Sequence, residues 1–240
     1  MTKILITGAN RGLGAGLARA CLKRGWTVIA AVRDPEALAG QFAGDIRPVR
    51  FSLDDLSTIG AVAEATEGAL DVFISNAAMT GGPLGAFGSF DVDRFLAACK
   101  ANAAAPMKLL EALAPALAAR RGKALVISSR LGANPFYGYA EYFASKTALN
   151  MLVKQASMPL AEQGVAVAAC HPGWVGTEAT GAMGQAPLTP DSGADLLLVL
   201  VERMTLADAG KFFDPDGSEL PIVPQQHEVK FYSKPRTATL

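Results

Sequence analysis

The chain has no surplus of charge of either sign: among its 240 residues are 22 Lys plus Arg and 22 Asp plus Glu. Proteins that bind nucleic acids usually carry a basic surplus or stripe, and no basic run is present here. The chain also lacks the uninterrupted apolar run of about 20 residues that a membrane span needs. Its first residues pass straight into a short β-rich run, without the longer apolar segment of a secretory signal. We therefore expect no nucleic-acid partner, no membrane partner and a cytoplasmic location.

Cysteine and histidine are scarce as well. Cys21, Cys99 and Cys170 are an odd number at wide spacing, which disfavours a disulfide framework. His171 and His227 are too few and too far apart to build a zinc centre by themselves. The sequence predicts no metal site, and it predicts that the three thiols are small core residues of a protein from a reducing compartment.

What the chain does have is an alternation of short β-rich runs with longer helical patterns. Most of the runs are apolar throughout, which is typical of strands buried on both faces of a parallel sheet. The pattern predicts an α/β fold: a doubly wound parallel sheet with helices on both faces, in a single domain over 1–223. The tail 224–240 has no predicted role. Strands are expected at 3–7, 27–32, 46–51, 71–75, 123–128, 165–170 and 210–213, and helices at 13–24, 55–68, 103–120 and 140–163.

A glycine-rich stretch, TGANRGLG at 7–14, follows the first strand and opens the first helix. Glycines at 8, 12 and 14 would permit a tight turn, let the backbone approach a pyrophosphate and let the helix lie close on the strand. The free amides and dipole of that helix would favour an anion. We interpret the stretch as a dinucleotide-binding loop; the alternative is a plain strand-to-helix turn.

The end of the second strand bears on the choice of cofactor. An acidic residue there would bind the 2′-hydroxyl of an NAD ribose, but the strand ends in Val32 and is followed by Arg33. Arg33 can form charge-assisted bonds with a 2′-phosphate, and Arg11 supplies a second cation. NADP(H) is therefore favoured over NAD(H). The alternative is that Arg33 and Asp34 form only a solvated turn.

A reactive pair is suggested by YFASK, in which Tyr142 and Lys146 lie four residues apart and share one face of a helix. A phenol with a pKa near ~10 is a poor base, and a neighbouring ammonium is expected to lower that pKa. The lysine keeps donors for the ribose hydroxyls of a nicotinamide nucleotide. Ser129 lies thirteen residues before the tyrosine, at the end of an apolar run. The alternative is one turn of a helix that carries both residues by chance.

Together, T-G-x-x-x-G-x-G and VISSRLG…YFASK resemble the short-chain dehydrogenase/reductase family in its non-extended branch. The resemblance runs from residue 3 to about 222, and its C-terminal part is similar to the carbonyl-reductase-like group that includes bacterial C-factor and insect sniffer proteins. It implies a Rossmann-type fold, and it implies catalytic roles for four residues. Ser129 would bond the substrate carbonyl, Tyr142 would transfer its proton, and Lys146 would orient ribose. Asn102 would anchor a water for proton relay, or alternatively would mark a helix kink or cap.

The same resemblance implies the cofactor site. Asn76 and Ala77 would lie beside the adenine-side ribose, and Val175 and Thr177 would hold the nicotinamide carboxamide. His171 would satisfy a backbone group rather than act as a base. The full set of expected cofactor residues is Gly8, Asn10, Arg11, Gly12, Leu13, Gly14, Arg33, Ser52, Leu53, Asn76, Ala77, Tyr142, Lys146, Pro172, Gly173, Val175 and Thr177.

Three positions depart from the family pattern. Ser52 stands where many relatives have an aspartate that reads the adenine, so adenine contacts would rest on Ser52 and the Leu53 backbone. Ser75 and Ala78 replace an asparagine and a glycine. None of these changes touches proton or hydride transfer.

The sequence thus predicts an NADP-dependent oxidoreductase that transfers a hydride between nicotinamide and a ketone, an aldehyde or the corresponding alcohol. The alternative is a dinucleotide-binding sensor or C-factor-like signalling protein whose catalysis is incidental; a nucleotide-sugar epimerase is disfavoured by the loop spacing. Helices 103–120 and 140–163 form an interface in many relatives, so a homo-oligomer is left open. We expect an apolar substrate pocket lined by Met79, Leu131, Phe136, Tyr137, Trp174 and Met183. The alternative is that these residues only pack under the loop.

Overall fold

A computed structural model describes residues 1–79, 88–133, 140–178 and 186–222. Its centre is one eight-stranded sheet in the order β3-β2-β1-β4-β5-β6-β7-β8, in which only β8 runs antiparallel to its neighbour. The seven predicted strands are all present, and β8 is the one that sequence reasoning missed. The bounds are β1 Lys3–Thr7, β2 Thr27–Val32, β3 Ile46–Arg50, β4 Val72–Ser75, β5 Lys123–Ile127, β6 Ala166–Cys170, β7 Phe212–Phe213 and β8 Glu219–Leu220.

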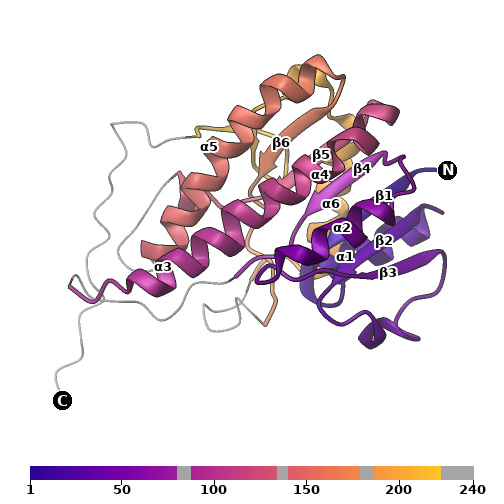
Figure 1. Cartoon of the computed structure of the whole chain (residues 1–240), viewed down its shortest axis with the longest axis horizontal. Helices are drawn as coiled ribbons and strands as arrows, with labels where there is room; N and C mark the ends of the chain where they lie inside the picture. The colour runs from indigo at the N-terminus through magenta and orange to yellow at the C-terminus, as the bar shows by residue number, and fades with distance from the viewer. Residues whose placement is uncertain (80–87, 134–139, 179–185, 223–240) are drawn as a thin grey trace.

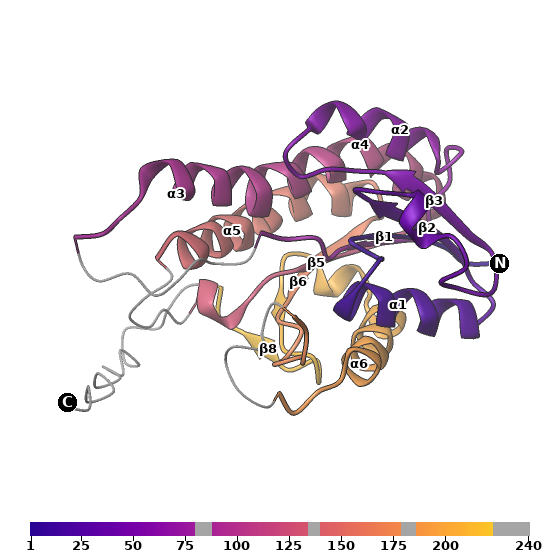
Figure 2. The same ribbon diagram turned by 90° about the horizontal axis from the view of Figure 1, so that it is seen from below.

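Helices cover both faces of the sheet (Figure 1). In Figure 2, α2, α4 and α5 lie on one side of the strands and α1 and α6 lie on the other. The predicted helix over 55–68 is shorter than expected, because a 3₁₀ turn precedes it. The helices α3 and α6 were not among those named from the sequence. The bounds are α1 Gly12–Lys23, α2 Ile59–Glu64, α3 Val92–Cys99, α4 Ala105–Arg120, α5 Ala140–Glu162 and α6 Pro190–Arg203.

The apolar strands serve two cores at once. Successive side chains of a strand point to opposite faces, so Ile4 and Ile6 of β1 pack with α1 and α6, whereas Leu5 packs with α4 and α5. The edge strand β3 differs from the expected double burial, because its arginines and Pro48 are exposed. Of the three cysteines, Cys21 and Cys170 are buried as predicted, and Cys99 is only partly buried.

The doubly wound order places the residues predicted to be functional at one edge of the sheet. From β1 the chain first builds toward β3, then returns to add β4 on the other side of β1. The carboxyl ends of β1 and β4 therefore border the crevice at which such sheets bind ligands. The glycine-rich loop follows β1, and Ser129 lies two residues beyond the end of β5, at the same edge.

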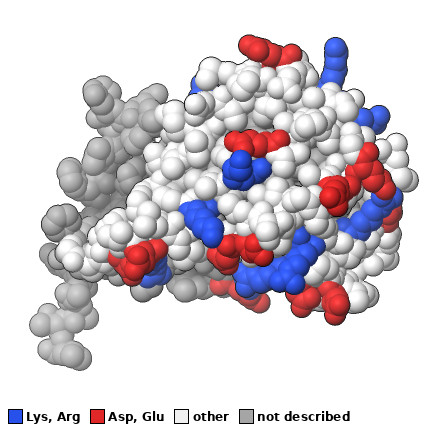
Figure 3. Space-filling view, viewed as in Figure 1, with Lys and Arg blue, Asp and Glu red and all other residues white. Residues whose placement is uncertain are grey.

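The surface seen in Figure 3 carries Lys and Arg interspersed with Asp and Glu, and neither sign gathers into a stripe on that face. Among the helices that the structure describes, none is both long and apolar enough to cross a membrane. Three predicted pocket residues, Phe136, Tyr137 and Met183, lie outside the described residues, as does the tail 224–240.

Candidate active site

The glycine-rich loop has the close approaches that its spacing predicts. Gly8 and Gly12 have φ angles of +70° and +52°, a region that favours glycine. A Cβ at Gly14 would lie 2.1 Å from the carbonyl oxygen of Gly8 and 2.7 Å from Nδ2 of Asn76. The three glycines therefore let α1 start directly against the ends of β1 and β4.

The N-terminus of α1 is open to an anion. Arg11 is the N-cap residue, its side chain makes no capping hydrogen bond, and the first turn contains no acidic residue. The first amides of a helix have no intrahelical acceptor, and the helix dipole adds positive potential at this end. A phosphate group is the kind of ligand that such an end binds.

Thr7 joins the loop to β4, and sequence reasoning left it out of the site. Its side chain is buried, and its Oγ1 accepts hydrogen bonds from the backbone N–H groups of Asn76 and Ala77, each at 2.9 Å. Nδ2 of Asn76 in turn donates to the carbonyl oxygen of Thr7 at 3.0 Å. The first letter of T-G-x-x-x-G-x-G could have revealed this role, because a buried threonine at a strand end needs partners.

The predicted catalytic side chains come together at the carboxyl end of β5. The Tyr142 phenol lies near the side chain of Ser129, which acts to lower the tyrosine pKa. The Lys146 ammonium donates to the carbonyl oxygen of Ile127 at 3.0 Å, and its Nζ lies 5.8 Å from the centroid of the Tyr142 ring. Since Tyr142 and Lys146 are one turn apart on α5, the helix aims both at the end of the strand.

The electrostatics of the pair differ from the prediction. Burial raises the pKa of Tyr142, the side chain of Ser129 opposes this effect, and Lys146 does not contribute to the shift. Burial lowers the pKa of Lys146 to about 8. The predicted lowering of the tyrosine pKa is therefore wrong: desolvation disfavours both charged forms, and the ammonium bonds a carbonyl instead of the phenol.

The turn that carries Ser129 is held against α5. It is a 3₁₀ turn, Arg130–Gly132, with Ser129 as N-cap accepting a hydrogen bond from the N–H of Leu131 at 3.1 Å. Thr147 donates to the carbonyl oxygen of Gly132 at 2.6 Å. A Cβ at Gly132 would lie 2.8 Å from the backbone of Lys146, so glycine permits this contact.

Asn102 lies in a π-helical turn, Lys100–Ala104, that joins α3 to α4. Its Oδ1 accepts from the N–H of Met79 at 2.7 Å, and its Nδ2 donates to the carbonyl oxygen of Met79 and to Ser145 Oγ. Ser145 itself donates to the carbonyl oxygen of Tyr142 at 2.7 Å. The sequence left open a helix kink or cap at Asn102, and the π-helical turn is an irregularity of that kind. The Asn102 amide links this turn to the segment after β4 and to α5, next to Tyr142.

The Pro-Gly turn lies against the glycine-rich loop. Gly173 has a φ of +79°, and Val175 is buried and pairs with Leu188 in an isolated bridge. A Cβ at Gly12 would lie 3.2 Å from Cγ2 of Thr177. The stretch expected to approach the pyrophosphate and the stretch expected to hold the nicotinamide carboxamide are therefore neighbours.

The residues expected around the adenine-side phosphate are accessible. Arg33 is exposed after the buried Val32, and it makes no ion pair with any described residue. Arg11 pairs with Glu178, and both side chains are exposed. Ser52 donates its backbone N–H to Thr58, and, like Leu53, it is partly exposed.

His171 takes no part in the constellation. Its backbone N–H donates to the carbonyl oxygen of Phe213, but Nδ1 of the imidazole ring is buried and has no hydrogen-bond partner among the described residues. The expectation that the side chain satisfies a backbone group is thus wrong for Nδ1. Burial lowers the pKa of His171 to about 4, which leaves the ring neutral at pH 7.

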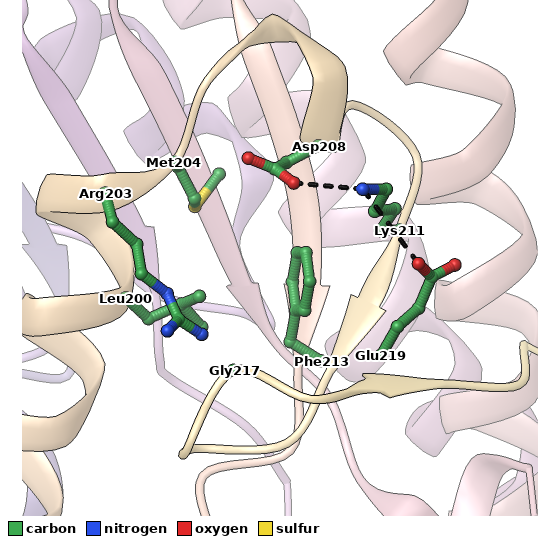
Figure 4. A pocket seen from close by; sticks show the side chains of 8 residues that line it. All are labelled: Leu200, Arg203, Met204, Asp208, Lys211, Phe213, Gly217 and Glu219. Atoms are coloured by element: carbon green, nitrogen blue, oxygen red, sulfur yellow. Dashed lines mark hydrogen bonds and ion pairs between the residues drawn. The ribbon is translucent and has the colours of Figure 1, made fainter.

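Three of the six expected pocket residues are described: Met79 and Leu131 are partly exposed, and Trp174 is exposed. A separate cavity of about 310 Å³ lies between α6, β7 and β8 and contains no candidate residue. Lys211 forms ion pairs there with Asp208 and Glu219, as Figure 4 shows. In the described ranges no three His, Cys, Asp or Glu residues are grouped as metal ligands.

Comparison with known proteins agrees with this geometry. Residues 2–187 match the family model described as short chain dehydrogenase. C-signal of Myxococcus xanthus is 34% identical over 160 residues, which cover 64% of this chain and 93% of that protein. Carbonyl reductase Sniffer of D. melanogaster superposes with a TM-score of 0.82 at 26% identity, over 92% of this chain and 99% of that one. The NADPH-bound carbonyl reductase from chicken fatty liver has a TM-score of 0.81 at 27% identity, over 92% and 98%. The chain belongs to the short chain dehydrogenase family, whose members are oxidoreductases acting on alcohol and carbonyl groups.

Proposed function

We propose that the protein is an NADP-dependent carbonyl reductase that reduces a ketone or an aldehyde to the alcohol. The observation that carries the proposal is the contact of Tyr142 with Ser129 above the buried Lys146. When bound, the nicotinamide nucleotide would supply the hydride. The chain would supply alignment of the carbonyl, one proton and a site from which water is excluded.

The two hydroxyls would take different roles. Ser129 Oγ would donate to the substrate carbonyl oxygen, and Tyr142 would donate the proton that this oxygen needs when the carbonyl carbon accepts the hydride. A neutral phenol is the form that can give a proton at neutral pH, and burial, which raises the pKa of Tyr142, keeps the phenol in that form. Asn102 would hold Tyr142 in place through Ser145 in addition to the relay role that the family implies.

NADP(H) is favoured by charge. Arg33 is exposed at the end of β2 and makes no ion pair within the described ranges, so it can receive a 2′-phosphate without losing a carboxylate partner. Arg11 would exchange the carboxylate of Glu178 for a phosphate oxygen. The chicken carbonyl reductase is NADPH-bound, which supports the same choice.

The substrate would be an apolar or aromatic carbonyl compound. Met79, Leu131 and Trp174 offer apolar surface, and the Trp174 side chain is 40% exposed beside the Pro-Gly turn. Such surface is the usual lining of small-molecule sites.

The test is a fluorescence titration with NADPH and NADH, followed by oxidation of the preferred nucleotide with a panel of aldehydes, diketones and quinones. We expect tight NADPH binding and turnover of at least one apolar compound. Failure to bind either nucleotide refutes the proposal.

The similarity to C-signal keeps a second function in view, that of a dinucleotide-binding signalling protein with incidental catalysis. The retention of both Tyr142 and Lys146 favours the enzyme. The signalling protein would be favoured instead if wild-type protein and Tyr142→Phe bind NADPH equally well and neither turns over any panel compound.

A further inference from the structure

Asn150 stands one helical turn beyond Lys146, on the stripe of α5 that also carries Tyr142. Residues four apart share one face of a helix, so the three side chains point the same way. Asn150 is only 1% exposed and Lys146 only 2%, which places both between the helix and the sheet. Two members of the stripe serve the proposed reaction, and the third has so far no role.

All three members of the stripe face the same short segment at the end of β5. The tyrosine lies near the side chain of Ser129, and the lysine ammonium donates to the carbonyl oxygen of Ile127. Between them, Oγ of Ser128 donates to Oδ1 of Asn150 at 2.5 Å. Asn150 therefore completes a set of polar contacts in which three consecutive residues of the strand end are each tied to α5.

Simple packing does not explain an asparagine at this place. Its Nδ2 is buried and has no hydrogen-bond partner among the residues that the structure describes. A buried amide with an unmade hydrogen bond destabilises the fold, whereas leucine has a similar volume and would avoid that cost. What the amide provides and leucine cannot is the acceptor for Ser128.

Ser128 is held from both sides. Its N–H donates to the carbonyl oxygen of Cys170 at 2.7 Å, which ties the backbone to β6, and its hydroxyl is tied to Asn150 on α5. The peptide group between Ile127 and Ser128 is thereby fixed in orientation. The carbonyl oxygen of that peptide is the one that receives the Lys146 ammonium, and the next residue is Ser129.

We propose that Asn150 is a positioning residue: through Ser128 it sets the Ile127 carbonyl, which aligns the Lys146 ammonium for ribose, and it sets Ser129 for the substrate carbonyl. This inference rests on the proposed function, because the groups that it positions are those of the reductase reaction. Asn150 itself touches neither substrate nor cofactor.

The experiment is a double-mutant cycle of Ser128→Ala, Asn150→Leu and the double variant. For each, we would measure kcat and KM for one carbonyl substrate, Kd for NADPH and Tm. Each single variant should lose about tenfold or more in kcat, since small misplacements of reacting groups cost much in rate, with KM changed less than threefold. NADPH binding should weaken about three- to tenfold. The double variant should be no worse than Asn150→Leu alone, because both changes remove the same bond.

Ser157→Ala is the matched control. Ser157 is another buried hydroxyl of α5, but it donates only to the carbonyl oxygen of Lys154 within the helix. Its loss should leave kcat and Kd at wild-type values. Equal losses in Ser157→Ala would assign the effect to general packing and overturn the proposal.

Two further results would overturn it: wild-type kcat and Kd in Ser128→Ala, or losses that multiply in the double variant. Ser128→Ala is the smaller change, so it decides the matter should Asn150→Leu not fold. If wild-type protein binds NADPH but reduces no compound, the proposed function fails, and the Kd cycle alone decides the role of Asn150. If wild-type protein binds neither nucleotide, both proposals are refuted.

Discussion

Replacing Lys146 with methionine should make the protein more stable at neutral pH while removing its activity. Burial lowers the pKa of Lys146 from 10.5 to about 8. Between these two values the unfolded chain holds a proton that the folded chain has lost, so stability rises with pH through that window. Below pH 8 the folded protein bears the full cost of a buried ammonium.

The size of the effect follows from the same pKa change. At about 1.36 kcal/mol per pH unit, a fall from 10.5 to about 8 corresponds to roughly 3 kcal/mol at pH 7. Methionine has a similar length and no charge, but it leaves the Ile127 carbonyl without its donor. Lys146→Met should therefore be more stable than wild type by about 2–3 kcal/mol at pH 7, and by less than about 1 kcal/mol at pH 10.

Urea denaturation of both proteins from pH 6.5 to 10 measures this difference. Lys154→Met, a change of an exposed lysine on the same helix, is the control and should stay within about 0.5 kcal/mol of wild type at every pH. Equal stability of wild type and Lys146→Met at pH 7 would refute the reasoning. So would a difference that does not shrink as the pH rises.

Three further changes test the site. Tyr142→Phe should lower kcat by about 10²–10⁴-fold and leave NADPH affinity within about twofold, because it removes only the transferable proton; normal turnover would exclude Tyr142 as the acid. Arg33→Asp should shift the ratio of NADPH to NADH affinity by about ten- to a hundredfold toward NADH, through lost phosphate bonds and new repulsion, and an unchanged ratio would remove Arg33 from the cofactor site. Gly14→Ala should destabilise the fold by about 1–3 kcal/mol and weaken nucleotide binding, since its Cβ would lie 2.1 Å from the Gly8 carbonyl oxygen. Gly60→Ala, in a helix with open space around it, should instead stabilise slightly, and a loss there equal to that of Gly14→Ala would contradict the steric argument.

Much of the fold could be predicted because its signals are local. Apolar runs such as those of β1 and β6 are unambiguous when both faces of a strand are buried, and the glycine spacing marks a turn by its own stereochemistry. The short strand β8 was missed because two residues carry no periodicity, and its pairing with β7 depends on a tight turn through Gly217. The order of the strands follows from the fold class and not from any one segment.

The sequence predicts residues of the candidate site where a spacing carries the chemistry, as for Tyr142 and Lys146, and their catalytic roles stay predictions. The residues that hold them could not be predicted, because their partners lie far away in the chain. Thr7 binds residues about 70 positions away, and Ser128 binds Asn150 across 22. In the sequence, Ser128 is only the neighbour of the serine that the family resemblance predicts to be catalytic, and Asn150 is one more residue of a helix.

The error about the tyrosine pKa has the same origin. Spacing shows that a phenol and an ammonium share a helix face, but burial and competing acceptors determine the pKa of each group. Here the Ile127 carbonyl receives the ammonium, and desolvation keeps the phenol neutral. The spacing therefore predicts which groups share a helix face, whereas burial determines their protonation states.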